Sequence, residues 1–248
     1  MSGAWADLLG RLARSWLPRP WMVRDLTVPL LAYAAASAAL AGWLRQRRGV
    51  RAAYTRKVFH FAVFNAAAAL QLLWGRSAVV LFGLVVSALI LAAVARGEGF
   101  GFYEALARPE DAPHRSLFIL VPLATTAAGG VLANLLFPGM AYVGYAVAGW
   151  GDAVGEPVGS AWGRHPYRVP SLAGVPATRT LEGSAAVAVC GALAAAAGLA
   201  LAGLPAGRAL GAGAACGMGA AIVEAASHHG LDNLTVQVAA AGLAAWLV

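Results

Sequence analysis

The residues best suited to chemistry in this chain lie between Gly151 and Ser184, its densest polar segment. Asp152 follows directly on an apolar run, and Glu156 comes four residues later, so on a helix both carboxylates share one face. Carboxylate oxygens suit Mg²⁺, which proteins usually hold through one or two carboxylates together with substrate phosphates. An acidic side chain at the end of a membrane helix also costs free energy on insertion, which favours a functional role. The pair predicts a metal and phosphate site.

Three glycines, at positions 155, 159 and 163, fall on the same helical face as Asp152. Small residues four apart are typical of helices that pack closely in a bilayer, and this explanation is sufficient for Gly159 and Gly163 taken alone. It does not explain the two acids on that face. Gly155 and Gly159 therefore also stand as candidates for close backbone approach to a phosphate.

The loop after this segment is basic, and Arg164 is its first candidate for binding phosphate. Such loops often mark only membrane topology. Arg179 differs because it stands just before the next apolar run, in Arg179-Thr180-Leu181-Glu182-Gly183, where free N–H groups at a helix start also favour an anion. Glu182 and Gly183 join it as candidates. The same run also fits a capping box, with Thr180 or Thr178 as the cap and Glu182 reaching back.

Two further clusters carry polar side chains at the ends of apolar runs. Arg56 and Lys57 open one run and could bind phosphate, although cations at such positions commonly snorkel to the interface. His60 lies one turn further inside, where it could orient a hydroxyl group. Near the C-terminus, Glu224 and the pair Asp232-Asn233 bracket a short turn. Asp232 could act as a base or metal ligand, or cap the last helix.

The elements that must position these residues are membrane helices. The chain is 60% hydrophobic and 12% charged, with a mean hydropathy of +0.69. This composition predicts an all-α, polytopic transmembrane helix bundle with seven or eight spans. We expect spans at about 26–44, 58–74, 77–95, 117–136, 138–151, 184–204, 209–226 and 233–248, the fifth being short unless it continues to about 163. The domains expected are an interfacial amphipathic segment over 1–24 and one transmembrane catalytic domain over 25–248.

The basic residues predict an orientation in the cell membrane. Twelve of them fall in alternate loops on one side, which the positive-inside rule makes cytoplasmic. Only Arg76 and Arg208 lie in the opposite loops, although the basic residues before position 25 do not fit this pattern. All the polar clusters then face the cytoplasm. The net charge of +7 needs no nucleic acid partner, because membrane lipids and anionic substrates explain it as well.

From about residue 50 to residue 248, the order of these motifs resembles the CTP-dependent lipid-alcohol kinases, a family of dolichol, phytol and farnesol kinases and the yeast-type diacylglycerol kinase. The matching motifs are RKxxH at an early span, GDxxxxxxG, a basic loop ending in (K/R)(T/S)xEGS, and E…DN before the final span. Gly155 stands where many members carry alanine. Arg179 stands where many carry lysine, which keeps the charge but changes its shape.

The resemblance implies transfer of the γ-phosphate of CTP to the hydroxyl of a lipid alcohol at the cytoplasmic face. Asp152 would bind the Mg²⁺-nucleotide, with Glu156 as a second ligand, while Lys57 and Arg179 would neutralise phosphate. Asp232 would be a general base or a second metal ligand, and His60 would orient the alcohol. The residues alone do not distinguish CTP from ATP, because the chain has neither a Walker loop nor a protein-kinase glycine loop.

Two alternatives remain at this stage. A phosphatidate cytidylyltransferase would use the same nucleotide and membrane, but the serine, lysine and paired aspartates that such enzymes carry near the C-terminus are not found. A non-catalytic transporter would explain buried polar residues as an ion path. It would need access from both faces, whereas the far-side loops are very short and no inverted repeat is visible.

Overall fold

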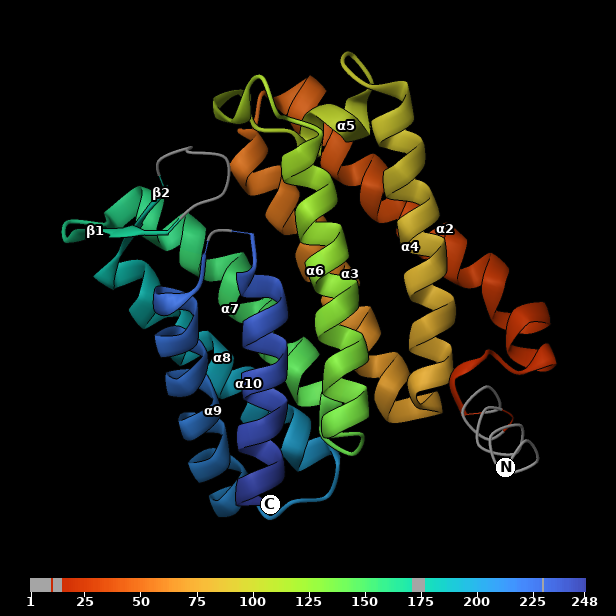
Figure 1. Cartoon of the computed structure of the whole chain (residues 1–248), viewed down its shortest axis with the longest axis vertical. Coiled ribbons are helices and arrows are strands. Elements are labelled where there is room, and N and C mark those ends of the chain that lie inside the picture. The colour runs from red at the N-terminus through yellow and green to blue at the C-terminus, as the bar shows by residue number, and fades with distance from the viewer. Residues whose placement is uncertain (1–9, 11–14, 171–176, 229) are drawn as a thin grey trace, which may run out of the picture.

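A computed structural model describes residue 10 and residues 15–170, 177–228 and 230–248 of the chain. Within them the chain folds as an all-α helix bundle, as the sequence predicted (Figure 1). Its long helices are α2 (Pro20–Arg48), α3 (Ala52–Trp74), α4 (Arg76–Arg96), α6 (Leu117–Leu136), α7 (Ala141–Trp162), α8 (Leu181–Leu201), α9 (Ala206–Ala226) and α10 (Asp232–Leu247).

Each expected span corresponds to one of these helices, with two changes at the ends. Helix α2 begins at Pro20 with proline in its first turn, so residues 20–24 belong to the first long helix rather than to a separate interfacial segment. Residues 1–9 and 11–14 of that expected segment lie outside the described residues. Helix α7 continues beyond Gly151 to Trp162, so the fifth run is not short.

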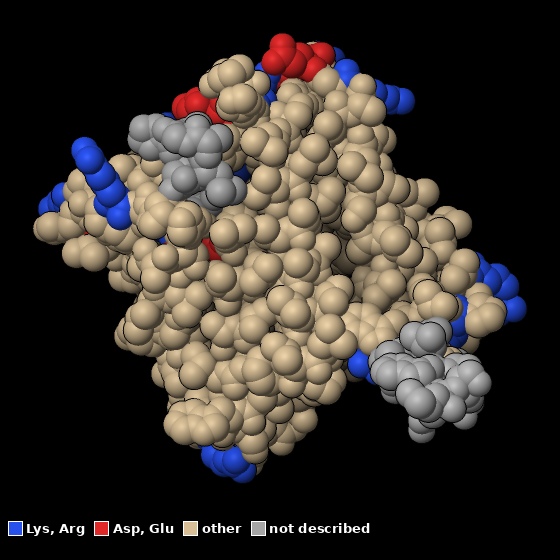
Figure 2. Space-filling view, in the orientation of Figure 1, with Lys and Arg blue, Asp and Glu red and all other residues tan. Residues whose placement is uncertain are grey.

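The protein is embedded in a membrane. Among the described residues, six helices (α2, α3, α4, α6, α8 and α9) are long and apolar enough to cross one. Their outward side chains stay apolar, as with Leu84 at 61% exposed, Val189 at 60% and Ile222 at 63%. Figure 2 shows a wide uncharged belt, with basic and acidic side chains gathered toward the ends and margins of the molecule. This distribution is what a lipid-facing surface requires.

The polar connections gather at one end of the bundle (Figure 1). The α2–α3 connection lies there, as does the α4–α6 connection, which contains α5 (Gly101–Leu106) and the short 3₁₀ helix η1 (Pro109–Asp111). In this connection burial opposes ionisation of Glu104, but hydrogen bonds from Arg115 and the Gly99 N–H group lower its pKa. That this end is cytoplasmic stays a prediction.

The basic loop after α7 contains two strands that the sequence analysis did not predict. Strand β1 (Pro166–Val169) pairs antiparallel with β2 (Ala177–Thr180), so that Tyr167 lies opposite Arg179. Thr180 then caps α8, because its Oγ1 accepts the Gly183 N–H at 3.1 Å. Glu182 does not complete the capping box and turns to His165, whose ring nitrogen lies at 2.7 Å. Strand β2 therefore places Arg179 directly before the N-terminus of α8.

Two hydrophobic cores make up the bundle. One is formed mainly by α2, α3, α4 and α5 and includes Phe59, Phe82 and Phe102. The other is formed mainly by α7, α8, α9 and α10 and includes Val147, Leu199 and Cys216. Helices α3 and α6 contribute side chains to both. The seam between the cores therefore runs along α3 and α6.

Glycines allow the C-terminal helices to approach one another closely. A Cβ on Gly183 of α8 would lie 2.9 Å from the Gly155 carbonyl oxygen of α7, closer than real contacts allow. On α9, a Cβ on Gly217 would lie 2.8 Å from the Ala192 Cα of α8. Small residues therefore let backbones meet where α7 packs on α8 at Gly155 and where α8 packs on α9.

Gly217→Ala should destabilise the protein by about 1–3 kcal/mol, because the added methyl group forces α8 and α9 apart. Gly211→Ala is the matched control. It lies on the same helix, where an added methyl group would meet nothing within 4 Å, and should be neutral or slightly stabilising. Thermal unfolding of both purified variants in detergent checks this. Equal melting temperatures for the two variants would contradict the close packing of α8 on α9.

Candidate functional site

A cavity of about 370 Å³ lies at the seam between the two cores, and we call it the inner cavity. Helices α3, α4, α6, α7, α8 and α10 line it, together with strand β2 and the end of α9. Most of the predicted site residues meet there, namely Arg56, Lys57, His60, Asp152, Gly155, Glu156, Gly159, Arg179, Gly183, Glu224, Asp232 and Asn233. Residues from distant parts of the sequence thus share one site.

The first charged cluster of this cavity joins α3 to α7. The Lys57 ammonium lies 2.5 Å from an Asp152 carboxylate oxygen and 2.9 Å from one of Glu156. The lysine side chain is only 8% exposed. Two acids one turn apart on α7 therefore converge on a single buried cation from α3, as their spacing of four residues permits.

Two arginines and a histidine surround this ion triplet. Arg56 lies 3.1 Å from Glu156, and Arg108, at the start of the 3₁₀ turn, lies 3.5 Å from the same carboxylate. His60 Nε2 lies 3.3 Å from Asp152 Oδ2 and 3.4 Å from the Ala148 carbonyl oxygen. Its ring stacks on Phe64 at 4.2 Å between centroids. His60 therefore stands where the charged cluster meets apolar side chains.

The second charged cluster is built around Arg179. Its guanidinium lies 2.7 Å from Asp232, at the first turn of α10, and 3.4 Å from Glu224, near the end of α9. The three side chains are between 12% and 17% exposed. Arg179 Nη1 is buried and has no hydrogen-bond partner among the described residues. One buried donor of this arginine thus remains available for an oxygen ligand.

Asp232 does not act as the N-cap of α10. The residue before the helix is Leu231, which makes no side-chain cap hydrogen bond, and Asp232 is already the first helical residue. Its Oδ1 accepts the N–H of Asn233 at 3.0 Å while Oδ2 accepts from Arg179. The carboxylate is therefore held in place from two sides at the wall of the cavity.

The charges of the inner cavity balance. Four basic side chains line it (Arg56, Lys57, Arg108 and Arg179), and four acidic ones face them (Asp152, Glu156, Glu224 and Asp232). No group of three or more His, Cys, Asp or Glu side chains spaced to hold a metal occurs within the described part of the chain. The convergence of Asp152 and Glu156 on one point nevertheless fits a hard cation that completes its coordination with phosphate oxygens.

Two predicted residues are not brought to this cavity. Arg164 is exposed in the turn after α7, and Glu182 pairs with His165 across the base of the hairpin. Both positions result from the pairing of β1 with β2, which turns the basic loop back on itself. Of the basic residues in this loop, only Arg179 reaches the seam between the two hydrophobic cores. Neither Arg164 nor Glu182 is therefore assigned a part in binding substrate.

The structure also places in the cavity residues that the sequence pattern did not reveal. Arg108 was expected only to mark membrane topology, since nothing in its spacing links it to Glu156. The apolar wall was missed as well, and it is formed by Phe59, Val63, Phe64, Val86, Ile90, Leu106, Phe118, Ile119, Pro122 and Leu123. Apolar side chains on a membrane helix look alike in sequence whether they face lipid, a core or a cavity.

Comparison with protein-family models, curated proteins and solved structures gives no match for this chain. Its function must therefore be inferred from the geometry of the site and from the motif order of the sequence.

Lys57→Met should lower the free energy of unfolding by about 3–5 kcal/mol, because Asp152 and Glu156 would lose their shared buried cation. The double variant Lys57→Met/Asp152→Asn should recover part of this loss, since one unpaired charge is removed with the cation. Thermal unfolding in detergent measures both effects.

The control is Arg24→Gln, which breaks the exposed Arg24–Asp25 pair and should leave the melting temperature unchanged. A Lys57→Met protein that melts like this control would show that the α3–α7 ion pair does not hold the helices together.

Proposed function

We propose that this protein is an integral-membrane kinase that transfers the γ-phosphate of CTP to the hydroxyl of a lipid alcohol. The observation that carries the proposal is the composition of the inner cavity, where eight charged side chains from six segments of the chain face an apolar wall within a membrane bundle. Such a site suits a reaction between a polyanion and an amphiphile. We place the site on the cytoplasmic face of the cell membrane.

The apolar wall supports a lipid acceptor. Its side chains come from α3, α4, α5 and α6, including Val63, Ile90 and Leu123. A long hydrocarbon chain placed against them would leave its hydroxyl group at the junction near His60. This is the position from which His60 would orient the hydroxyl, as the motif order suggests.

The two charged clusters support phosphoryl transfer. This reaction depends on positioning and on neutralising phosphate charge more than on covalent help from the protein. Lys57 and Arg56 would hold phosphate from the α3 side, and Arg179 would do so from the hairpin side through its unpaired Nη1. The close backbone approach at Gly155, Gly159 and Gly183 keeps these two sides together.

In the proposed reaction a bond forms between the alcohol oxygen and the γ-phosphorus, the bond to the β,γ-bridging oxygen breaks, and CDP leaves. Asp232 would accept the hydroxyl proton. Its carboxylate is fixed by Arg179 and by the Asn233 N–H group, and Glu224 lies against the same arginine. Asp152, with Glu156 beside it, would hold Mg²⁺, which when bound neutralises charge on the phosphate oxygens. The choice of CTP rests on the resemblance of the motif order alone.

Purified protein in detergent, given γ-labelled CTP, Mg²⁺ and a panel of lipid alcohols, should transfer label to lipid. Asp152→Asn should reduce this transfer below about a tenth of the wild-type rate while the protein still purifies as a folded species. Release of pyrophosphate with phosphatidate as acceptor would identify a cytidylyltransferase instead. No turnover with any nucleotide or acceptor tested would contradict both enzymatic functions and favour the transporter alternative.

Arg179→Gln should lower kcat/KM by about 100-fold or more, on the order of 3 kcal/mol, if this arginine neutralises the transferring phosphate. Arg179→Lys should recover much of the loss, because a cation remains between Glu224 and Asp232, although the fork geometry is lost.

The defect must appear with saturating alcohol and with every alcohol tested. A loss confined to one alcohol would place Arg179 in the lipid pocket, and a normal rate for Arg179→Gln would remove it from the site.

A further inference from the structure

A second cavity, of about 350 Å³, adjoins the first at the polar end of the bundle, and we call it the outer cavity. It is lined by the end of α2, the start of α3, the 108–111 turn, α7 and both strands of the hairpin. Five residues line both cavities, namely Arg108, Glu156, Ser160, Thr178 and Arg179. The two spaces are therefore neighbours with a common polar wall.

The two cavities differ in the residues that they do not share. Apart from the five shared residues, the outer cavity is lined by Arg45, Arg51, Glu110 and Asp111 and by small or aliphatic residues. The aromatic and branched apolar side chains of α4 and α6 line the inner cavity alone. A ligand of the outer cavity would therefore be polar, while the apolar wall suits the hydrocarbon chain of a second ligand.

Two of the four arginines that line the outer cavity are paired with carboxylates, and two are not. Arg108 donates two hydrogen bonds to Asp111, at 3.1 and 3.2 Å, and Arg179 is held by Asp232 and Glu224. Arg45 donates to the Val50 carbonyl oxygen at 3.3 Å, and neither Arg45 nor Arg51 forms an ion pair with a described carboxylate. Two arginines without a carboxylate in direct contact thus face this space, which favours an anionic ligand.

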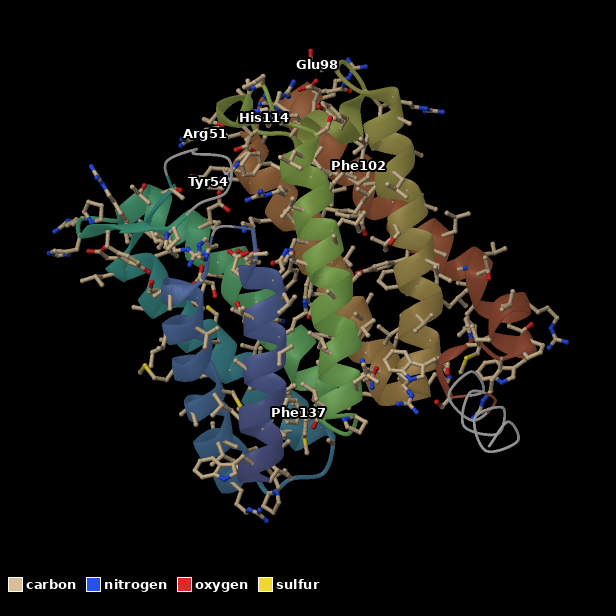
Figure 3. The ribbon with its side chains drawn as sticks, viewed as in Figure 1. Arg51, Tyr54, Glu98, Phe102, His114 and Phe137 are labelled. Atoms are coloured by element: carbon tan, nitrogen blue, oxygen red, sulfur yellow. The ribbon has the colours of Figure 1, made fainter. Side chains whose placement is uncertain are left out.

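Arg51 also contacts an aromatic ring. Its guanidinium lies over the Tyr54 ring, 5.3 Å from the ring centroid. Figure 3 shows both residues at the polar end of α3, on the side of the hairpin. A guanidinium stacked on an aromatic ring keeps its N–H groups free to donate in the plane of the guanidinium, as binding of phosphate oxygens requires.

We propose that the outer cavity binds the nucleoside and the proximal phosphates of a nucleoside triphosphate, with Arg45 and Arg51 as phosphate ligands. This inference rests on the proposed function and names the place of its water-soluble substrate. The terminal phosphate passes the common wall at Arg108 and Arg179 and reaches the inner cavity, where the alcohol lies. The two substrates then approach from different sides, the nucleotide from the polar end and the alcohol from the bundle interior.

The test is equilibrium binding of a fluorescent N-methylanthraniloyl derivative of CTP, with Mg²⁺, to the purified full-length protein, followed by anisotropy. Arg45→Gln and Arg51→Gln should each weaken binding about tenfold, as expected for the loss of a charge-assisted hydrogen bond. In the transfer assay the KM for nucleotide should rise with the KM for alcohol unchanged. Ala53→Phe, which narrows the outer cavity without removing charge, should weaken nucleotide binding in the same way.

The matched control is Arg47→Gln, which removes an exposed arginine in the last turn of α2, beside Arg45, that does not line the outer cavity. Its nucleotide affinity should equal that of the wild type. Equal weakening by Arg47→Gln and Arg51→Gln would show a diffuse effect of charge and overturn the inference. Wild-type affinity in the Arg45, Arg51 and Ala53 variants would overturn it and leave the proposed function standing. A wild-type protein that neither binds nucleotide nor transfers phosphate would refute the proposed function itself.

Discussion

The ion triplet of Lys57 with Asp152 and Glu156 is the interaction on which the arrangement of this protein depends. It joins α3 to α7, and so joins the two hydrophobic cores along their seam. A buried charge is tolerated inside a membrane bundle only when a partner meets it, so neither helix could present these side chains without the other. The inner cavity lies beside this contact, and all three side chains of the triplet line it.

The balance of charge in this cavity shapes how substrates can bind. Four basic and four acidic side chains neutralise one another, so the protein can keep them at membrane depth without added ions. A phosphate bound as proposed would have to compete with carboxylates for Lys57, Arg56 and Arg179. Each carboxylate that it displaced would become available for a cation. In the proposed reaction, binding of a polyanion and binding of a divalent cation would therefore be coupled through the same ion pairs.

The sequence predicted the bundle well and the site in part. Long apolar runs have few alternatives to helices in a bilayer, so all eight were located. The shared face of Asp152 and Glu156 followed from helical periodicity. Periodicity says nothing about contacts between distant helices, so Arg108 and the apolar wall were missed. The hairpin was not predicted because its strands are only four residues long. Without the hairpin, the positions of Arg164 and Glu182 outside the cavity could not be predicted either.

The position of α10 has a consequence for the depth of the inner cavity. Figure 1 shows that α10 begins inside the bundle, short of the end where α2 joins α3 and α4 joins α6. Asp232, in its first turn, therefore lies below that end, with Arg179 and Glu224 close to it. In the proposed reaction, a lipid alcohol would meet these charged side chains within the bundle and would not first have to be lifted out of the membrane.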